Sequence, residues 1–304
     1  MTGAISMGVQ FWWFYDVIAV AVILVSIFLS VRKGLIKTIA ALTGFVLSAV
    51  IAFSAGGPIA ELMYEQSEKG SNIKKFDLTL ETVDFVDDLG NQLENLGYNI
   101  RIDNNELREA LYDEIDPEQK IYKYVNNINN KKVDEESIFI NKLHESYAVI
   151  ISNYVAKRMN AYSAECAAEE MRKHPEKAYE FSKLLDDLDT KRPAAQYLTD
   201  NFLKKPYMTQ TKLLAMVLIF AVGAIITVAV SIYTGRKHGP MGGFVEAVIS
   251  GILGIAISVT IIIFIALMIR LYVVMGSDKM LFFNHEAIEN TYVFKYFYEF
   301  ISGL

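Results

Sequence analysis

The sequence has few of the residues from which enzymes and disulfide-linked proteins build their sites. Its 304 residues include one cysteine, Cys166, and four scattered histidines. A single cysteine excludes a disulfide within the chain and any metal site built from a cysteine cluster. The Gly-x-Ser-x-Gly segment of hydrolases, a phosphate-binding glycine loop and the His-Glu-x-x-His segment of zinc proteases are all missing. We therefore expect a protein that is not an enzyme and has no metal or cofactor.

Charge is also missing from long stretches of the chain. Residues 58–208 hold 29 of the 35 acidic and 20 of the 29 basic side chains, a net charge of −9. The remainder carries 6 acidic and 9 basic side chains, a net charge of +3. The acidic block lacks the clustered Lys and Arg that phosphate binding requires, so we expect no nucleic-acid partner.

Four apolar runs occupy most of the remainder. A helix needs about 20 largely apolar residues to cross the hydrocarbon core of a membrane. The runs predict spans at about 11–31, 38–57, 213–235 and 247–270. The first reaches this length only when the aromatic residues Phe11–Tyr15 are counted, and Trp and Tyr do favour the membrane interface. The fold class is therefore expected to be all-α, a four-helix transmembrane bundle.

Two other interpretations of the apolar runs are less consistent with the sequence. In a cleaved signal peptide the positive charge precedes the apolar segment, whereas here it follows the first run. Buried helices of a soluble core rarely need four charge-free stretches of this length.

Two short basic loops predict the orientation in the membrane. "SVRKGLIK", residues 30–37, joins spans one and two, and "GRKHGP", residues 235–240, joins spans three and four. Short cytoplasmic loops collect Lys and Arg. We expect both loops inside a bacterial cytoplasmic (inner) membrane, and the N-terminus, residues 58–208 and the C-terminus outside.

These observations divide the chain into four parts. Residues 1–57 form a transmembrane hairpin, 58–208 an extracytoplasmic insert, and 209–275 a second hairpin. Residues 276–304 are rich in Phe and Tyr, which predicts an amphipathic tail that lies on the membrane or packs against the insert.

The insert is predicted to be mainly helical. One apolar face recurs at three- and four-residue spacing, at Ile140, Leu143, Tyr147, Ile151 and Tyr154. Asp134 is the expected cap of this helix, which could continue through residues 161–174. Asp103 or Asn104 is expected to cap another helix, and Pro175 to begin a third. The segment 126–132 reads as a polar loop, and only 98–102 suggests a strand.

Small residues recur every four positions along the predicted spans, and so share a helical face. Span two has Ala40, Gly44, Ser48 and Ala52, span three has Gly223, Thr227 and Ser231, and span four has Ser250, Gly254 and Ser258. Such faces allow helices to pack closely within a chain, and they can also form a pore or a mobile interface. The sequence leaves both interpretations open.

Three ionisable residues stand near the ends of the spans. Asp16 opens span one, Glu246 opens span four and Arg270 closes it. All are close enough to an interface to reach water, and an acid suits a helix N-terminus. No charge is expected at mid-membrane depth, so the usual signature of a proton relay is missing.

Taken together, the acid that opens span one, the basic turn with a glycine, the Gly/Ser-rich second span and "GGFVEAVISGILGIAIS" resemble the bacterial colicin V production (CvpA) family. The resemblance covers about 11–57 and 209–275, and residues 58–208 would be a large insert. It implies a small inner-membrane protein with four spans.

The matching positions are these. Asp16 stands at the position of the family's leading Asp. The family's basic turn is matched by Arg32, Lys33 and Gly34, and Lys37 occupies a commonly basic position. Glu246 stands for a later Asp, Gly254 holds the middle of three spaced glycines, and Ser250 and Ser258 replace the outer two. Ala247 replaces the family's Arg, so any role of that Arg is not expected here.

The resemblance implies an accessory role in the production or export of a colicin V-like toxin, or in envelope maintenance. The insert would then be the module that contacts envelope or export proteins, and the chain could form homo-oligomers within the lipid bilayer. The alternative is an oligomeric channel or transporter formed through the small-residue faces. A membrane-bound hydrolase is a third hypothesis, although no nucleophile–base pair supports it.

Overall fold

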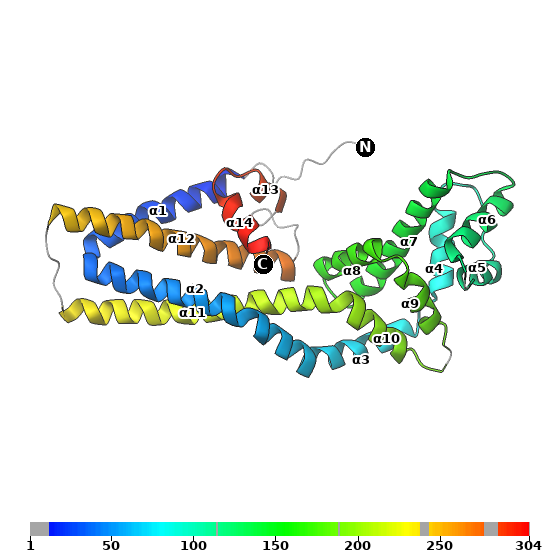
Figure 1. The fold of residues 1–304 in the computed structure, drawn as a ribbon, viewed down its shortest axis with the longest axis horizontal. Helices are drawn as coiled ribbons and strands as arrows, with labels where there is room; N and C mark the ends of the chain where they lie inside the picture. The colour runs from blue at the N-terminus through cyan, green and yellow to red at the C-terminus, as the bar shows by residue number, and fades with distance from the viewer. Residues whose placement is uncertain (1–11, 114, 188, 238–242, 277–284, 304) are drawn as a thin grey trace. The chain divides into compact units, whose positions relative to one another are not determined.

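The computed structural model describes residues 12–113, 115–187, 189–237, 243–276 and 285–303. Those residues form helices joined by turns, with no strand among them, so the all-α prediction is confirmed (Figure 1). Phe11, residues 238–240 of the second basic loop and part of the predicted tail lie outside this described part.

The described helices form two compact units. Unit 1 comprises residues 1–62 and 208–304, and unit 2 comprises residues 63–207. Helical backbone runs without a break through Leu35–Leu80 and Arg192–Thr234 and so continues across both boundaries. The predicted spans therefore extend beyond the membrane-length runs.

Unit 1 contains the four helices that are long and apolar enough to cross a membrane, as judged over the described residues. They are α1 (Trp13–Lys33), α2 (Leu35–Met63), α11 (Lys204–Lys237, which begins in unit 2) and α12 (Phe244–Met275). Even the shortest has 21 residues, about 31 Å of helix, which matches the roughly 30 Å hydrocarbon core. The four predicted spans are therefore present, each longer than expected at one or both ends.

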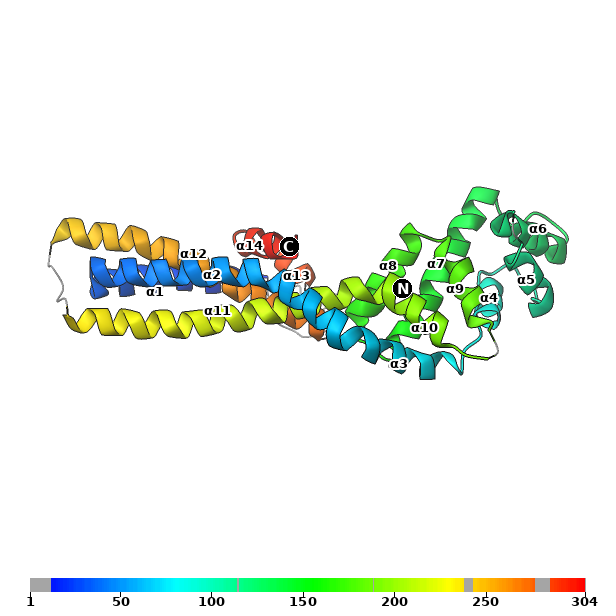
Figure 2. The same cartoon turned by 60° about the horizontal axis from the view of Figure 1, so that its bottom comes forward.

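These four helices pack as two pairs. Helices α1 and α12 lie side by side, as do α2 and α11 (Figures 1 and 2). Phe220 of α11 stacks on Phe45 of α2 within its own pair, with a centroid distance of 6.4 Å, and on Phe264 of α12 in the other pair, at 4.5 Å. The result is the predicted four-helix bundle.

Two short helices cover the end of unit 1 at which α1 begins. They are α13 (His285–Glu289) and α14 (Phe294–Ser302), and α14 packs on both α1 and α12. Tyr15 stacks on Phe294 at 5.3 Å, and Phe53 lies edge-on to Phe300 at 5.9 Å. The predicted amphipathic tail is thus a helix that packs on the membrane unit.

Unit 2 is built from shorter helices: α3 (Lys69–Leu80), α4 (Phe85–Glu94), α5 (Asn104–Leu111), α6 (Pro117–Asn129), α7 (Glu136–Ala156), α8 (Ala161–Lys173), α9 (Lys177–Leu185) and α10 (Arg192–Leu198). Two π-helical segments flank them, η2 (Tyr64–Glu68) and η3 (Thr199–Leu203). The Tyr64 hydroxyl donates to the Thr199 carbonyl at 3.1 Å, which joins the two segments. The prediction of a mainly helical insert is confirmed.

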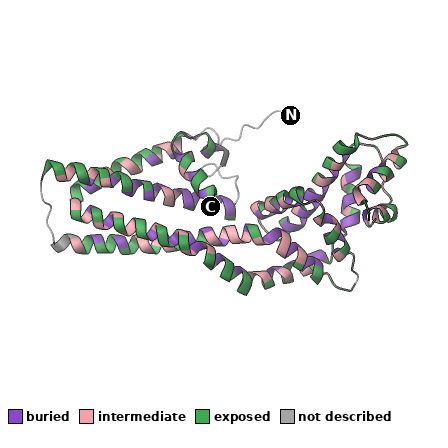
Figure 3. Cartoon of the chain, viewed as in Figure 1, coloured by how far each residue is buried: buried purple, intermediate pink, exposed green. Residues whose placement is uncertain are grey.

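Unit 2 has a continuous apolar core. Its centre is filled by large side chains from α3, α4, α7 and α9 that are fully or almost fully buried, among them Phe76, Phe85, Phe139 and Phe181. Four of the five residues of the predicted periodic face in α7, among them Leu143 and Ile151, belong to this core, whereas Ile140 does not. Figure 3 shows buried residues along the inward faces of these helices.

Several predicted details of unit 2 were wrong. Asp134 does not cap α7, because its carboxylate accepts hydrogen bonds from Tyr98 and Lys142 instead. Helix α7 ends at Ala156, and Asn160 caps the separate helix α8 by accepting from the Ser163 N–H.

Other helix ends were predicted with mixed success. Asp103 caps α5 as expected. Its carboxylate accepts hydrogen bonds from the backbone N–H groups of Asn105 and Glu106. Pro175 lies in a turn before α9 rather than at its start. Helix α6 continues to Asn129 and so takes up half of the predicted polar loop. Residues 98–102 form no strand, and Asn99 has a positive φ of 55°.

Candidate functional site

The turn between α1 and α2 requires a glycine. Gly34 has φ +83°, a conformation that residues with a side chain rarely adopt. The Thr38 hydroxyl then donates to the carbonyl oxygens of Ser30 at 3.1 Å and Gly34 at 2.9 Å. We call this end of unit 1, with Arg32, Lys33 and Lys37, the basic end.

Glu246 reaches this turn from another helix. Its carboxylate, in the first turn of α12, accepts a hydrogen bond of 2.9 Å from the N–H of Leu35, the first residue of α2. The first N–H groups of a helix have no partner within that helix, and a carboxylate also suits the positive end of its dipole. Glu246 therefore caps α2 and joins the start of α12 to the basic end.

Asp16 makes an equivalent contact at the opposite end of unit 1. Its carboxylate accepts three backbone hydrogen bonds at the start of α14, from Tyr292 at 2.7 Å, Val293 at 2.9 Å and Phe294 at 3.0 Å. Asp16 lies in the first turn of α1, but it caps α14 rather than its own helix. The two acids of the family pattern thus each hold the N-terminus of a different helix.

The small residues of α2 and α11 pack against one another reciprocally. A Cβ added to Gly44 would clash with Thr227, and one added to Gly223 would lie 2.6 Å from the Cβ of Ser48. The hydroxyls of Ser48 and Thr227 each donate at 2.7 Å to the carbonyl of the glycine four residues earlier. Each glycine therefore receives a compact hydroxyl side chain from the facing helix.

Helices α1 and α12 approach equally closely around Gly254. A Cβ at this position would lie 2.9 Å from both the Ser26 carbonyl oxygen and the Ser30 hydroxyl. Ser250 and Ser258, one turn away on either side, are fully buried. The Ser258 hydroxyl donates to the Ile255 carbonyl at 2.7 Å, whereas the hydroxyl of Ser250 has no hydrogen-bond partner in the described part.

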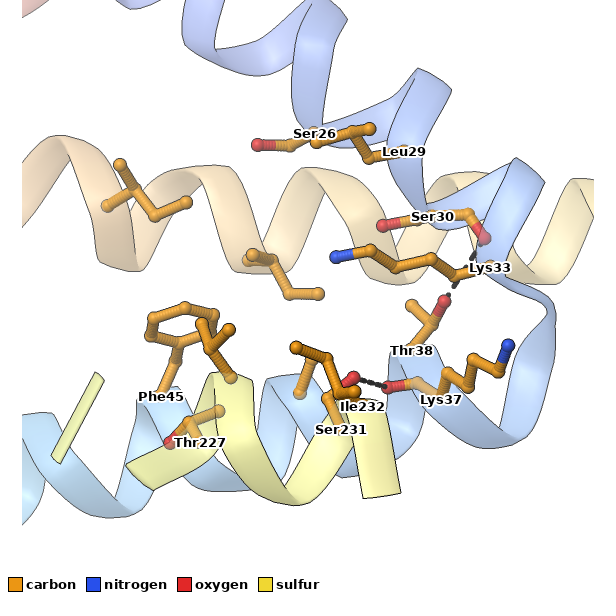
Figure 4. Close-up of a pocket in the computed structure, with 14 residues that line it drawn as sticks. Ser26, Leu29, Ser30, Lys33, Lys37, Thr38, Phe45, Thr227, Ser231 and Ile232 are labelled. Carbon is orange, nitrogen blue, oxygen red and sulfur yellow. Dashed lines mark hydrogen bonds between the residues drawn. The ribbon is translucent and has the colours of Figure 1, made fainter. Parts of the chain in front are cut away.

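A cavity of about 550 Å³ lies between the four long helices near the basic end (Figure 4). Its lining includes Ser26 and Ser30 of α1, Thr38 of α2 and Thr227 of α11. Lys33 and Lys37 also border it, and Figure 4 shows the Lys33 side chain extended toward the interior. Polar and basic groups therefore meet an otherwise apolar space at this end of the bundle.

A smaller cavity, of about 220 Å³, lies in unit 2 around Arg108. The Arg108 guanidinium pairs with Asp186 and, at 3.1 Å, with Asp84, and the bond to Asp186 raises its pKa. Burial raises the pKa of Tyr112 to about 12, and its hydroxyl donates to the Ser182 carbonyl at 3.2 Å. The charged groups here satisfy one another, which indicates a structural cluster that ties α5 to α4 and α9.

Among the described His, Cys, Asp and Glu side chains, no group of three or more has an arrangement that could hold a metal ion. Cys166 is half-buried on α8. The described part thus offers no constellation to which we can assign a reaction.

The structure brings the predicted site residues together in three groups. Arg32, Lys33, Gly34 and Lys37 share the basic end with Glu246. Gly44 and Ser48 belong to the contact with α11, and Gly254 to the contact with α1. Asp16 lies apart from all of them.

Thr38 and Phe45 also line the larger cavity, although neither was predicted as a site residue. The position of Thr38, four residues after the turn glycine Gly34, was a signal in the sequence that could have identified it.

Comparison with known families supports the resemblance. Residues 15–83 match the family model described as colicin V production protein, a range that contains most of α1 and all of α2 and α3. The predicted resemblance is confirmed over that range, while Glu246, Ser250, Gly254 and Ser258 lie outside it. No curated protein and no solved structure matches the chain. With its four long apolar helices, the chain is a multi-pass membrane protein, and its residues 15–83 are similar to the colicin V production family.

Proposed function

From the colicin V production domain in residues 15–83, we propose that this protein is a non-enzymatic accessory component of the bacterial cytoplasmic membrane. Unit 1 anchors the chain, and unit 2 stands on the outer side, where it binds a protein of toxin export or envelope maintenance. The basic end then faces the cytoplasm, in keeping with the positive charge of its short loop.

The main support for the proposal is that the small-residue faces pack against other helices of the same chain. Gly44, Gly223 and Gly254 each contact a neighbouring helix of the same bundle so closely that a Cβ would not fit. Helices associate in lipid through such faces. Because these faces are already occupied, they favour an anchor over an assembly that needs them to bind further copies.

Unit 2 supports the second half of the proposal. Its continuous core gives it a fixed surface of its own, which a loop between two spans would lack. The block 58–208 carries a net charge of −9, and an acidic surface attracts a basic partner and speeds its association. We therefore assign partner binding to unit 2 and expect the partner's contact surface to be basic.

A deletion tests this division of roles. Tyr64 and Tyr207 lie with their ring centroids 5.8 Å apart, so a short flexible linker can replace residues 65–206. Cells without the native protein would receive either the full chain or this deletion. The readouts are secreted toxin activity, sensitivity to detergent and the amount of protein in the membrane.

We expect the deletion to insert at normal abundance and to lose the activity that the full chain restores. Full activity without unit 2 would overturn the assignment of partner binding. Flux of ions or solutes through liposomes that contain only the deletion variant would favour the alternative of an oligomeric channel.

A further inference from the structure

The cavity near the basic end has features that an anchor does not need. Its volume of about 550 Å³ falls within the roughly 300–1,000 Å³ of small-molecule sites. All four membrane-spanning helices contribute to its lining. It therefore has the size of a small-molecule binding site.

The walls of the cavity suit a hydrocarbon chain. Most of the lining is apolar, including Leu29, Phe45, Val228, Ile232, Ile257 and Ile261. Leu29 and Ile232 remain 42% and 59% exposed, so the cavity opens to the outside of the bundle. Around membrane-spanning helices that outside is lipid, and an acyl chain can enter without crossing water.

The polar border of the cavity suits an anion. Figure 4 shows the Nζ atom of Lys33 directed toward the interior, while that of Lys37 points back toward the turn. Neither Lys33 nor Lys37 takes part in an ion pair with another described residue. Glu246, the acid of this end, is occupied by its bond to the Leu35 N–H. The cavity thus places an unneutralised ammonium group beside an apolar space.

We propose that this cavity binds one anionic phospholipid. The phosphate group pairs with Lys33, with Lys37 nearby, and an acyl chain occupies the space between Phe45, Ile257 and Ile261. Basic pockets between membrane helices bind anionic head groups in this way. A free phosphate ion would leave the apolar walls uncovered, so the lipid fits both parts of the site.

The test uses the full chain, purified in a neutral detergent. Phosphatidylglycerol, phosphatidylcholine or inorganic phosphate is added, and bound molecules are counted by native mass spectrometry. Lys33→Gln removes the charge at the cavity. Arg32→Gln is the matched control, because Arg32 belongs to the same turn but stacks on Phe28 at 5.3 Å and does not line the cavity. Lys33→Arg keeps the charge.

We expect one tightly held phosphatidylglycerol, bound about fivefold more weakly by the Lys33→Gln variant, since a basic residue near a lipid surface contributes about that factor. Arg32→Gln should weaken it less than twofold, and Lys33→Arg should restore it. Equal losses for Lys33→Gln and Arg32→Gln would overturn the proposal in favour of general surface charge. Equal binding of phosphatidylcholine, or displacement of the lipid by inorganic phosphate, would also contradict it.

Discussion

In unit 2 the large apolar side chains point inward, and Phe76, Phe139 and Phe181 are fully buried. In unit 1 many of them point outward: Ile225 is 70% exposed and Ile252 62% exposed. Burial of apolar surface away from water stabilises unit 2. The same side chains on unit 1 face lipid, which is as apolar as they are and gives no such drive for the helices to associate.

The two units therefore depend on different contacts. Unit 2 is held by the volume of its core side chains. Unit 1 is held by close approach at glycines such as Gly44 and Gly254 and by the carboxylates of Asp16 and Glu246, which cap helices other than their own. Substitutions in the two units should consequently act by different mechanisms.

The chain carries a natural reporter for each unit. Both tryptophans, Trp12 and Trp13, belong to unit 1, and the only cysteine, Cys166, belongs to unit 2. Tryptophan fluorescence and thiol reactivity can thus follow the two units separately in one full-length sample.

The largest effect is expected from Phe181→Ala in the core of unit 2. Removing a fully buried phenylalanine leaves a cavity and should cost about 4 kcal/mol of unfolding free energy. The reaction rate of Cys166 with a maleimide in urea measures the change. Leu78→Ala is the control, because Leu78 of α3 is 56% exposed and its truncation should cost little. If tryptophan fluorescence reports the same loss of unfolding free energy for unit 1, the two units are not distinct.

The next largest effect is expected from Gly44→Leu in unit 1. The added side chain would collide with Thr227, and overpacking of this kind costs about 3 kcal/mol. Thermal unfolding followed by tryptophan fluorescence checks it. Gly57→Leu is the matched control on the same helix, where an added Cβ meets nothing within 4 Å. If both variants are equally stable, the small-residue contacts do not hold the bundle.

Asp16→Ala should have an intermediate effect confined to α14. Loss of a cap for three backbone N–H groups costs about 1–2 kcal/mol, so residues 292–302 should exchange their amide hydrogens faster. Asp16→Asn keeps the Oδ1 acceptor, which takes two of the three bonds, and should retain most of the protection. Unchanged exchange in Asp16→Ala would mean that aromatic packing alone fixes α14.

The smallest effect is a dependence of unit 2 on acid. The hydrogen bond from Arg172 lowers the pKa of Glu145 in the folded state below the ordinary value of 4.5. The pair therefore adds stability above pH 4.5 that is lost as the pH falls through the folded-state pKa.

Because Glu145 and Arg172 are both more than a third exposed, the gain is only about 0.5 kcal/mol. Glu145→Gln should reduce the acid-induced rise in Cys166 reactivity slightly. Glu169→Gln is the control, because Glu169 is exposed on α8 and takes part in none of the ion pairs of the described residues. This substitution should leave the acid-induced rise in Cys166 reactivity unchanged. Equal effects from both would remove the ion pair from the explanation.

The spans were predictable because the thickness of a membrane fixes the length of an apolar helix. The packing faces were visible as four-residue spacings, but the sequence could not say which faces meet. Gly44 pairs with Thr227, 183 positions later in the chain, and only the fold brings them together.

The roles of the charged residues were harder to predict. Asp16 was expected at its own helix N-terminus, yet it binds backbone groups 276–278 residues away. Asp134 has the position of a cap, but Lys142 and Tyr98 offer it an ion pair and a hydroxyl. A carboxylate has several partners of similar strength, and tertiary contacts decide among them.

Cysteine labelling tests the proposed orientation of the chain in the membrane most directly. In a Cys166→Ser background, Ser67→Cys places a thiol on the exposed surface of unit 2, and Arg32→Cys places one at the basic end. Intact cells are treated with a membrane-impermeant maleimide, and permeabilised cells serve as the control. We expect intact cells to label only the Ser67→Cys variant, and labelling of the Arg32→Cys variant alone would contradict this orientation.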